Sequence, residues 1–136
     1  MKGIRNIRFK NYNYSNDGYY FVTIASNNRM MFSESELGLI ENQIKDFSWI
    51  KGIEVDYHIL MIDHVYMILV LTGCELGLGE VIRRFKAKTS RLAERRLWQP
   101  NYYEHVIRNE KALSKIREYI QNNPIVEKID FEDFYR

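Results

Sequence analysis

Two ring-bearing residues, His64 and Tyr66, stand two positions apart at the start of an apolar run and are of types that can do chemistry. Alternate residues of a strand point to the same side, so both rings would face one way, beside the polar break at Ile62-Asp63. Such a pair can converge on a divalent cation, although a neutral phenol is a poorer ligand than an imidazole. Two amphipathic rings that pack against a helix are the simpler interpretation, and the spacing alone leaves both open.

A second pair, Tyr119 and Asn123, lies four positions apart in a segment with helical periodicity. Residues at this spacing share one face of a helix. The pair could therefore supply a nucleophilic phenol and an amide oxygen as a metal ligand, although a phenol needs a base or an electrophile to assist it at neutral pH. A tyrosine at the edge of the core and an asparagine that caps the helix would give the same pattern.

Basic side chains crowd the exposed face of a third segment, which has helical periodicity from residue 78 onward, and only Glu80 and Glu94 oppose them. Two tyrosines follow, so phosphate contacts and base stacking could be combined there. The pattern favours nucleic-acid binding, with an ordinary surface helix as the alternative. The predicted contacts are Arg83, Arg84, Lys86, Lys88, Arg91, Arg95, Arg96, Tyr102 and Tyr103. The two other histidines, His58 and His105, are expected to support a site at most.

The strands that must position these residues follow from the apolar pattern. Residues 19–25 are aromatic and β-branched, which predicts a strand. Residues 54–61 and 64–71 predict an antiparallel pair. The run 64–71 is apolar on both of its faces, which is typical of a central strand covered from both sides.

Three helices complete the pattern. Ser33 with Glu36 three positions later is a capping box that opens the first helix, Asn109 can cap the last, and Pro124 is expected to end it. The acidic tail is expected to pack through Ile129, Phe131 and Phe134. This order predicts an α+β fold, with helices on one face of an antiparallel sheet of the ferredoxin-like or RRM-like type. The apolar helix faces carry Leu37, Ile40, Ile44 and Phe47, then Leu78, Val81, Ile82, Phe85, Thr89 and Leu92, then Leu113, Ile116, Tyr119 and Ile120.

Length, composition and net charge limit the class of protein to which the chain can belong. A chain of 136 residues with 46% apolar content is expected to form one domain over residues 1–136. A single cysteine, Cys74, excludes an internal disulfide framework and suits a reducing cytoplasm. No apolar run approaches the roughly 20 residues of a membrane helix. The net charge of +2 is too small to argue nucleic-acid binding without its distribution along the chain.

Several segments combine into a distinctive pattern. They are 13–15 with 18–24, Met61-Ile62-Asp63-His64-Val65-Tyr66, and 79–86, and the most specific are Leu97-Trp98-Gln99-Pro100-Asn101-Tyr102-Tyr103 through Arg108, and Tyr119-Ile120-Gln121-Asn122-Asn123-Pro124. Over nearly the whole chain they resemble the REP-associated tyrosine transposases, a branch of the single-tyrosine HUH transposases.

The resemblance implies an RRM-like sheet with the motif strand at its centre, and an enzyme that cleaves and rejoins single-stranded DNA beside a hairpin. It implies Tyr119 as the nucleophile that forms a 5′-phosphotyrosine, and His64 and Asn123 as ligands of Mg²⁺ or Mn²⁺. The second motif histidine falls on Tyr66, which departs from the family pattern. A phenol there could coordinate the cation weakly, could hydrogen-bond a metal-bound water, or could abolish metal binding. The resemblance is also compatible with a homodimer, and with a cytoplasmic protein of the bacterial nucleoid.

Three functions are carried forward. The first is a metal-dependent transposase that cleaves DNA. The second is a hairpin-DNA-binding protein derived from such an enzyme and disabled at Tyr66. The third is an RNA-binding module on a similar sheet, which would need stacking residues on an open sheet face.

Overall fold

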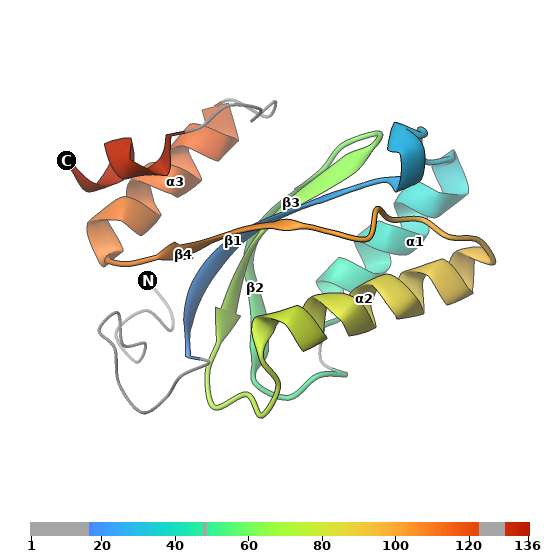
Figure 1. The fold of residues 1–136 in the computed structure, drawn as a ribbon, viewed down its shortest axis with the longest axis horizontal. Coiled ribbons are helices and arrows are strands. Elements are labelled where there is room, and N and C mark those ends of the chain that lie inside the picture. The colour runs from blue at the N-terminus through green and yellow to red at the C-terminus, as the bar shows by residue number, and fades with distance from the viewer. Residues whose placement is uncertain (1–16, 48, 123–129) are drawn as a thin grey trace.

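The chain forms a four-stranded antiparallel sheet with helices packed on it (Figure 1). The structure, a computed structural model, describes residues 17–47, 49–122 and 130–136. The strands follow the order β2-β3-β1-β4 across the sheet, and each neighbouring pair is antiparallel. This order agrees with the predicted ferredoxin-like β-α-β-β-α-β unit. The strands are β1 (Gly18–Ala25), β2 (Ile53–Leu60), β3 (His64–Leu71) and β4 (Tyr103–Ile107).

Two of the helices begin at the residues that the sequence predicts as caps. The Glu36 N–H donates to the Ser33 hydroxyl and the Ser33 N–H donates to the Glu36 carboxylate, which confirms the capping box. The Ala112 N–H donates to the Asn109 side chain at 2.8 Å, so the last helix is capped as predicted. Pro124, expected to end that helix, lies outside the described residues. The helical elements are α1 (Glu34–Lys45), α2 (Leu78–Ala93), α3 (Glu110–Asn122) and the 3-10 helices η2 (Asn27–Arg29) and η3 (Phe131–Tyr135).

The sheet separates two apolar cores. On one face, α1 and α2 cover β3 residues such as Val65 and Met67. On the other face, α3 and η3 cover β3 residues such as Tyr66 and Ile68 (Figure 1). The prediction of helices on one face only is therefore wrong, whereas the prediction that β3 is covered from both sides is confirmed. Both faces of β3 are apolar, so leaving either of them in water would forfeit much of the hydrophobic stabilisation.

A few apolar positions refine the prediction. Leu92, predicted on the buried side of α2, is 46% exposed in the last turn of the helix, which ends at Ala93, and Leu97 beyond that end is buried in the core of α1 and α2. Phe131 of the tail is buried as expected, while Ile129 lies outside the described residues. Across the ranges that the structure describes, no helix is long and apolar enough to cross a bilayer.

Candidate active site

His64, at the first position of β3, is held through one ring nitrogen. Its Nδ1 lies 2.6 Å from Oδ1 of Asp63, and the Arg29 guanidinium donates to Oδ2 of the same carboxylate at 3.1 and 3.3 Å. Burial by itself would raise the pKa of Asp63, but the hydrogen bonds from His64 and Arg29 outweigh burial and hold that pKa below its ordinary value. An ionised carboxylate only accepts hydrogen bonds, so a neutral imidazole in this contact carries its proton on Nδ1.

The other ring nitrogen of His64 is the unusual one. Nε2 is buried and has no hydrogen-bond partner within the described chain. In the neutral imidazole with its proton on Nδ1, Nε2 carries a lone pair. A buried lone pair without a donor is costly in a folded protein, and such groups call for an explanation. A cation bound at Nε2 would supply that explanation.

Tyr66 shares the sheet face of His64, as the alternation predicts. The two ring centroids lie 4.8 Å apart at 70°, and the Tyr66 ring also stacks on Phe21 at 6.0 Å. Tyr66 is 2% exposed and belongs to the core beneath α3. These contacts agree with the simpler interpretation of Tyr66, an aromatic ring that packs against a helix.

The donor set for a cation is correspondingly small. No three His, Cys, Asp or Glu side chains come together as a metal-binding group in the part of the chain that the structure covers. Asn123, the predicted amide ligand, lies outside the described residues. The imidazole of His64 is of a type that can bind a divalent cation, and its neighbour on the same sheet face, Tyr66, is a phenol.

Tyr119 lies on α3, the helix that covers the same sheet face. It is half-buried, and its ring packs edge-on against Phe134 of η3 with centroids 5.6 Å apart. Arg117, two positions earlier, forms an ion pair with Asp56 of β2, with a Nε–Oδ2 distance of 2.7 Å, and so ties α3 to the edge of the sheet. Tyr119 also lines a surface pocket of about 340 Å³ together with Lys115, Glu118, Asn122 and Phe134.

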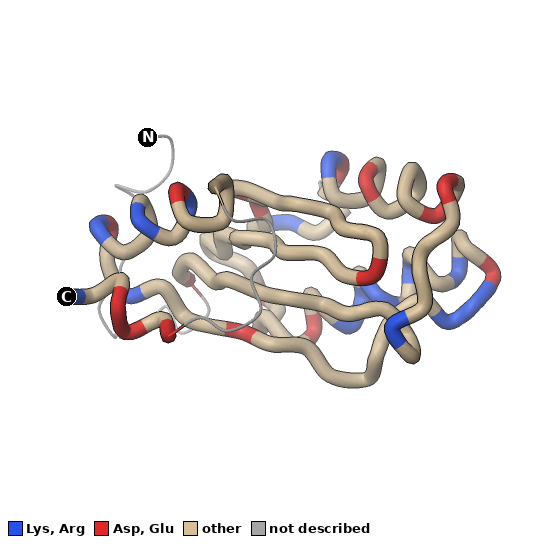
Figure 2. Tube along the Cα trace, turned by 90° about the horizontal axis from the view of Figure 1, so that it is seen from above, with Lys and Arg blue, Asp and Glu red and all other residues tan. Residues whose placement is uncertain are grey.

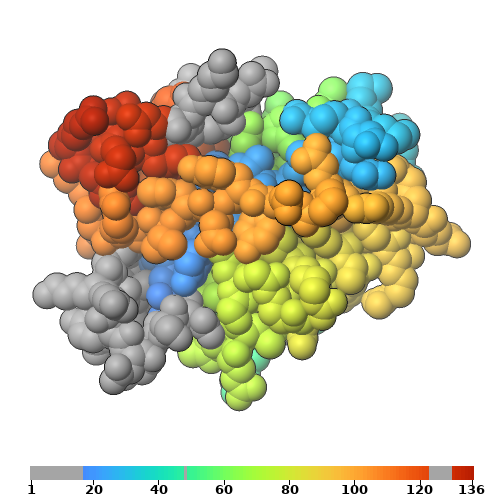
Figure 3. Space-filling model, viewed as in Figure 1, coloured from blue at the N-terminus to red at the C-terminus, as the bar shows by residue number. Residues whose placement is uncertain are grey.

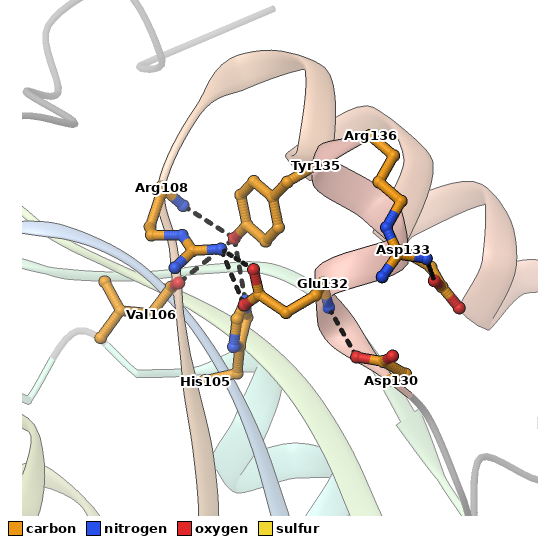
Figure 4. Close-up of polar contacts among 8 residues, drawn as sticks. All are labelled: His105, Val106, Arg108, Asp130, Glu132, Asp133, Tyr135 and Arg136. Atoms are coloured by element: carbon orange, nitrogen blue, oxygen red, sulfur yellow. Dashed lines mark hydrogen bonds and ion pairs between the residues drawn. The ribbon is translucent and has the colours of Figure 1, made fainter.

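The element η3, which supplies Phe134, is anchored to β4 by a polar cluster (Figure 4). The Tyr135 hydroxyl lies 2.8 Å from Nε2 of His105 and accepts from the Arg108 N–H at 3.0 Å. The Arg108 guanidinium donates to both oxygens of Glu132 at 2.8 Å. The His105 ring stacks on Phe131 with centroids 4.3 Å apart, and burial, aided by the Arg108 charge, lowers the pKa of His105. His105 therefore helps to hold η3, the element whose Phe134 contacts Tyr119.

His58, the third histidine, lies on the opposite side of the sheet. Its Nε2 is 2.9 Å from a carboxylate oxygen of Glu41 on α1. It links β2 to α1 and lies in the layer away from Tyr119.

Most of the cations predicted to contact nucleic acid have partners within the protein. Arg83 and Arg84 both donate to Glu80 at 2.6 to 2.8 Å. The Lys86 ammonium donates to three successive backbone carbonyls, those of residues 99–101, at 2.8 to 3.1 Å, and burial lowers its pKa. Arg83, Arg84 and Lys86, which the sequence predicts on one cationic face, are therefore already bonded to a carboxylate or to backbone carbonyls of the protein.

The three arginines near the end of α2, Arg91, Arg95 and Arg96, differ in their partners. Arg95 forms a bidentate ion pair with Glu36 at 2.5 and 2.8 Å. Arg91 and Arg96 are exposed, and their guanidinium groups have no ion pair or hydrogen bond with any residue that the structure describes. Figure 2 shows blue segments gathered along α2 and the turn after it, with red segments between them. Of the predicted contacts, Arg91 and Arg96 are the arginines most available to phosphates.

The remaining predicted contacts lie near this helix or at the edge of the sheet. Lys88 lies over the Trp49 ring at 4.4 Å. Tyr102 packs partly against the core of α1 and α2, whereas Tyr103 on β4 is 50% exposed on the α3 side. Tyr19, Phe21 and Tyr66 of the central strands are buried in the core beneath α3 and η3, which argues against an open, RNA-stacking sheet face.

Two site residues escaped the sequence analysis. Asp63 precedes His64 directly, so its adjacency could have pointed to it. Arg29 is separated from Asp63 by 34 positions, and no local sequence pattern predicts their contact.

Comparisons with known proteins agree with this fold. Residues 13–123 match the family described as Transposase IS200 like. The chain is also 32% identical to an uncharacterised protein of Haemophilus influenzae over 159 aligned positions, which cover 90% of this chain and 88% of that protein.

Two solved structures share the fold. One is a REP-associated tyrosine transposase bound to a REP hairpin, with a TM-score of 0.70, 22% identity, and coverage of 85% of this chain and 72% of that one. The other is a candidate transposase from Deinococcus radiodurans R1, with a TM-score of 0.56, 21% identity, and coverage of 83% and 95%.

The fold and the family match define a protein of the transposase class, a class of enzymes that process DNA. This chain belongs to the IS200-like transposase family.

Proposed function

We propose that this chain cleaves and rejoins single-stranded DNA through a covalent link to Tyr119, as a REP-associated tyrosine transposase does. The observation that carries the proposal is the buried, unpartnered Nε2 of His64 within the described residues, on the sheet face that α3 covers with Tyr119. The similar structure bound to a REP hairpin supports a hairpin-bearing single strand as the substrate.

The chemistry is a reversible transfer of a phosphodiester. The Tyr119 Oη attacks the scissile phosphorus, a bond from Oη to phosphorus forms, and the bond from phosphorus to the 3′ oxygen breaks. The phenolic proton passes through water to the leaving 3′ oxygen. The products are a 5′-phosphotyrosine and a free 3′-hydroxyl, and attack by a 3′-hydroxyl reverses the step. The pocket of about 340 Å³ that Tyr119 lines, together with Lys115 and Glu118, supports the approach of a phosphate to the ring.

A Mg²⁺ or Mn²⁺ ion held by His64 and Asn123 would stabilise negative charge on that phosphate. His64 is prepared for this role because Asp63 keeps its proton on the other nitrogen. Arg91 and Arg96 would bind the phosphates of the flanking strand.

A second candidate function is hairpin-DNA binding without cleavage. The observation that favours it is the burial of Tyr66, which fills the second motif position with a packed phenol in place of an imidazole. A site with one imidazole holds a hard cation less well than a site with two.

A covalent-adduct assay separates the two functions. Wild type, Tyr119→Phe and Tyr66→His are each mixed with labelled hairpin-bearing single strands in Mn²⁺ and run on a denaturing gel. Tyr103→Phe is the matched control, because it removes an exposed phenolic hydroxyl on the same sheet face and keeps the ring.

An adduct that forms with wild type and Tyr103→Phe and is lost in Tyr119→Phe supports the transposase. An adduct that appears only with Tyr66→His supports the binding protein. An adduct that persists in Tyr119→Phe contradicts Tyr119 as the nucleophile.

A further inference from the structure

His64 is the end of a chain of three side chains from two separate segments. Arg29 of η2 donates through Nε and a terminal nitrogen to Oδ2 of Asp63, and Oδ1 of Asp63 accepts from Nδ1 of His64. The exposed fraction of the side chains falls along the chain, from 55% for Arg29 through 23% for Asp63 to 12% for His64. The chain therefore runs from the surface to the buried Nε2.

The backbone holds the same two segments together. The turn between β2 and β3 carries Asp63, and its carbonyls accept from the loop around η2. The Ser26 N–H donates to the Asp63 carbonyl at 2.8 Å, and the Phe32 N–H donates to the Ile62 carbonyl at 2.7 Å. Asp63 is thus fixed through its main chain as well as its carboxylate, so the ring of its neighbour has a defined position.

The loop around η2 rests in turn on the Leu97-Trp98-Gln99 segment. The Asn27 N–H donates to the Leu97 carbonyl at 2.7 Å, and the Gln99 N–H donates to the Ala25 carbonyl at 2.9 Å. Figure 3 shows the segment that leads into β4 (orange) against the atoms of the η2 region (blue). Trp98 is buried and contacts Phe32 edge-on at 5.2 Å. The most specific segment of the sequence therefore acts as a support for the Arg29 loop.

Asn28 and Arg29 have positive φ angles of 55° and 56°, which non-glycine residues seldom adopt. Residues in this conformation persist where the surroundings hold them, and they concentrate at functional sites. Arg29 adopts this backbone conformation at the position from which its side chain contacts Asp63.

We propose that Arg29 and Asp63 are positioning residues that lock the His64 proton on Nδ1 and so keep the Nε2 lone pair available for a divalent cation. The use of that lone pair rests on the proposed function, whereas the position of the proton does not. Arg29 matters because it occupies Oδ2 with a donor and leaves only Oδ1 to face the imidazole.

The substitution Asp63→Asn tests this lock. Arg29 only donates, so the new amide must turn its oxygen toward Arg29 and its NH₂ group toward His64. Nδ1 of His64 would then have to accept, and its proton would move to Nε2. In a serine-protease triad, replacing the aspartate by asparagine likewise selects the wrong histidine tautomer.

Adding Arg29→Met should reverse the effect. Without the guanidinium, the amide can rotate and present its oxygen to Nδ1–H of His64. Nε2 lacks a described acceptor, so a proton there stays unsatisfied and the Nδ1–H form is preferred. Glu41→Gln is the matched control, because it changes the carboxylate beside His58 and leaves His64 alone.

The measurement is the ring ¹⁵N spectrum of the three histidines in alkaline buffer, where neutral tautomers are distinguished, without DNA or metal. We expect His64 as Nδ1–H in wild type, Nε2–H in Asp63→Asn, and a return to mainly Nδ1–H in the double variant with Arg29→Met. Glu41→Gln should change only the His58 signals.

A wild-type His64 with its proton on Nε2, or an Asp63→Asn variant that keeps Nδ1–H, overturns the proposal. So does a double variant that behaves like Asp63→Asn alone. The expected tautomers in a protein that forms no DNA adduct in any variant would leave the lock standing and count against the proposed function.

Discussion

The ion pair between Glu36 and Arg95 makes a sharp prediction about stability. Glu36 opens α1 and Arg95 follows α2, so the pair joins the two helices on one face of the sheet. The substitution Glu36→Gln removes the carboxylate charge but keeps an oxygen that can accept from the Ser33 N–H, so the capping box survives. The stability change then reports the ion pair rather than the cap.

The magnitude follows from the pKa. Hydrogen bonds from Arg95, opposed by burial and aided by Ser33, lower the pKa of Glu36 from 4.5 to about 2. At about 1.4 kcal/mol per pH unit, this difference corresponds to roughly 3 kcal/mol. Arg95 is 32% exposed, so solvent screening reduces the expected contribution to about 1 to 2 kcal/mol.

The pKa of Glu36 also determines in which direction the free energy of unfolding changes with pH. The folded-state pKa of Glu36 lies below the ordinary 4.5, so the stabilisation is fully present above about pH 4.5 and is lost as the pH falls toward 2. Urea unfolding of wild type and Glu36→Gln should therefore differ at pH 7 and converge as the pH is lowered from 4.5 to 3.

Two further variants complete the experiment. Arg95→Met should cost about as much as Glu36→Gln at pH 7, because either change breaks the same pair. Glu34→Gln removes an exposed charge from the same helix turn and should change the free energy of unfolding by less than about 0.5 kcal/mol. A difference between wild type and Glu36→Gln that does not change between pH 7 and pH 3 would refute the reasoning.

Three other predictions follow from the same structure. Arg91→Ala and Arg96→Ala should each reduce the slope of log Kd against log salt for single-strand binding by about 0.7, as measured by fluorescence anisotropy. Lys86→Met should leave that slope unchanged and should lower the free energy of unfolding, because Lys86 binds backbone carbonyls. Tyr66→His should raise Mn²⁺ affinity at least about tenfold in a paramagnetic-broadening titration, and equal affinities would count against the cation at this site. Trp98→Phe removes a buried hydrogen bond to a threonine hydroxyl and should cost about 1 to 2 kcal/mol in urea unfolding, so an unchanged midpoint would contradict its supporting role.

Local sequence patterns predict much of the fold. The alternation in residues 64–71 predicts both faces of β3, and the two helix caps mark where α1 and α3 begin. These features depend on backbone geometry and on neighbours within a few positions, so they can be predicted from the sequence alone. The same alternation also places His64 and Tyr66 on one face, which the structure bears out.

The expectation of helices on one face failed for a different reason. Capping and periodicity predict that α3 exists but not which side of the sheet it covers. That side depends on where the apolar stripe of α3, with Leu113, Ile116 and Ile120, finds a complementary face.

The charges show the same division. Seven basic residues look equivalent along the chain, yet packing pairs Arg95 with Glu36 across 59 positions and leaves Arg91 exposed. The contact of Arg29 with Asp63 across 34 positions likewise depends on tertiary contacts of the η2 loop, which is bonded to the turn before β3 and to the Trp98 segment. Local sequence thus specifies which groups could act on DNA. The assembly of distant segments determines which of these groups are free of internal partners and which ring nitrogen of His64 carries the proton. The reason is that ion pairs and tautomers depend on contacts a few ångströms long.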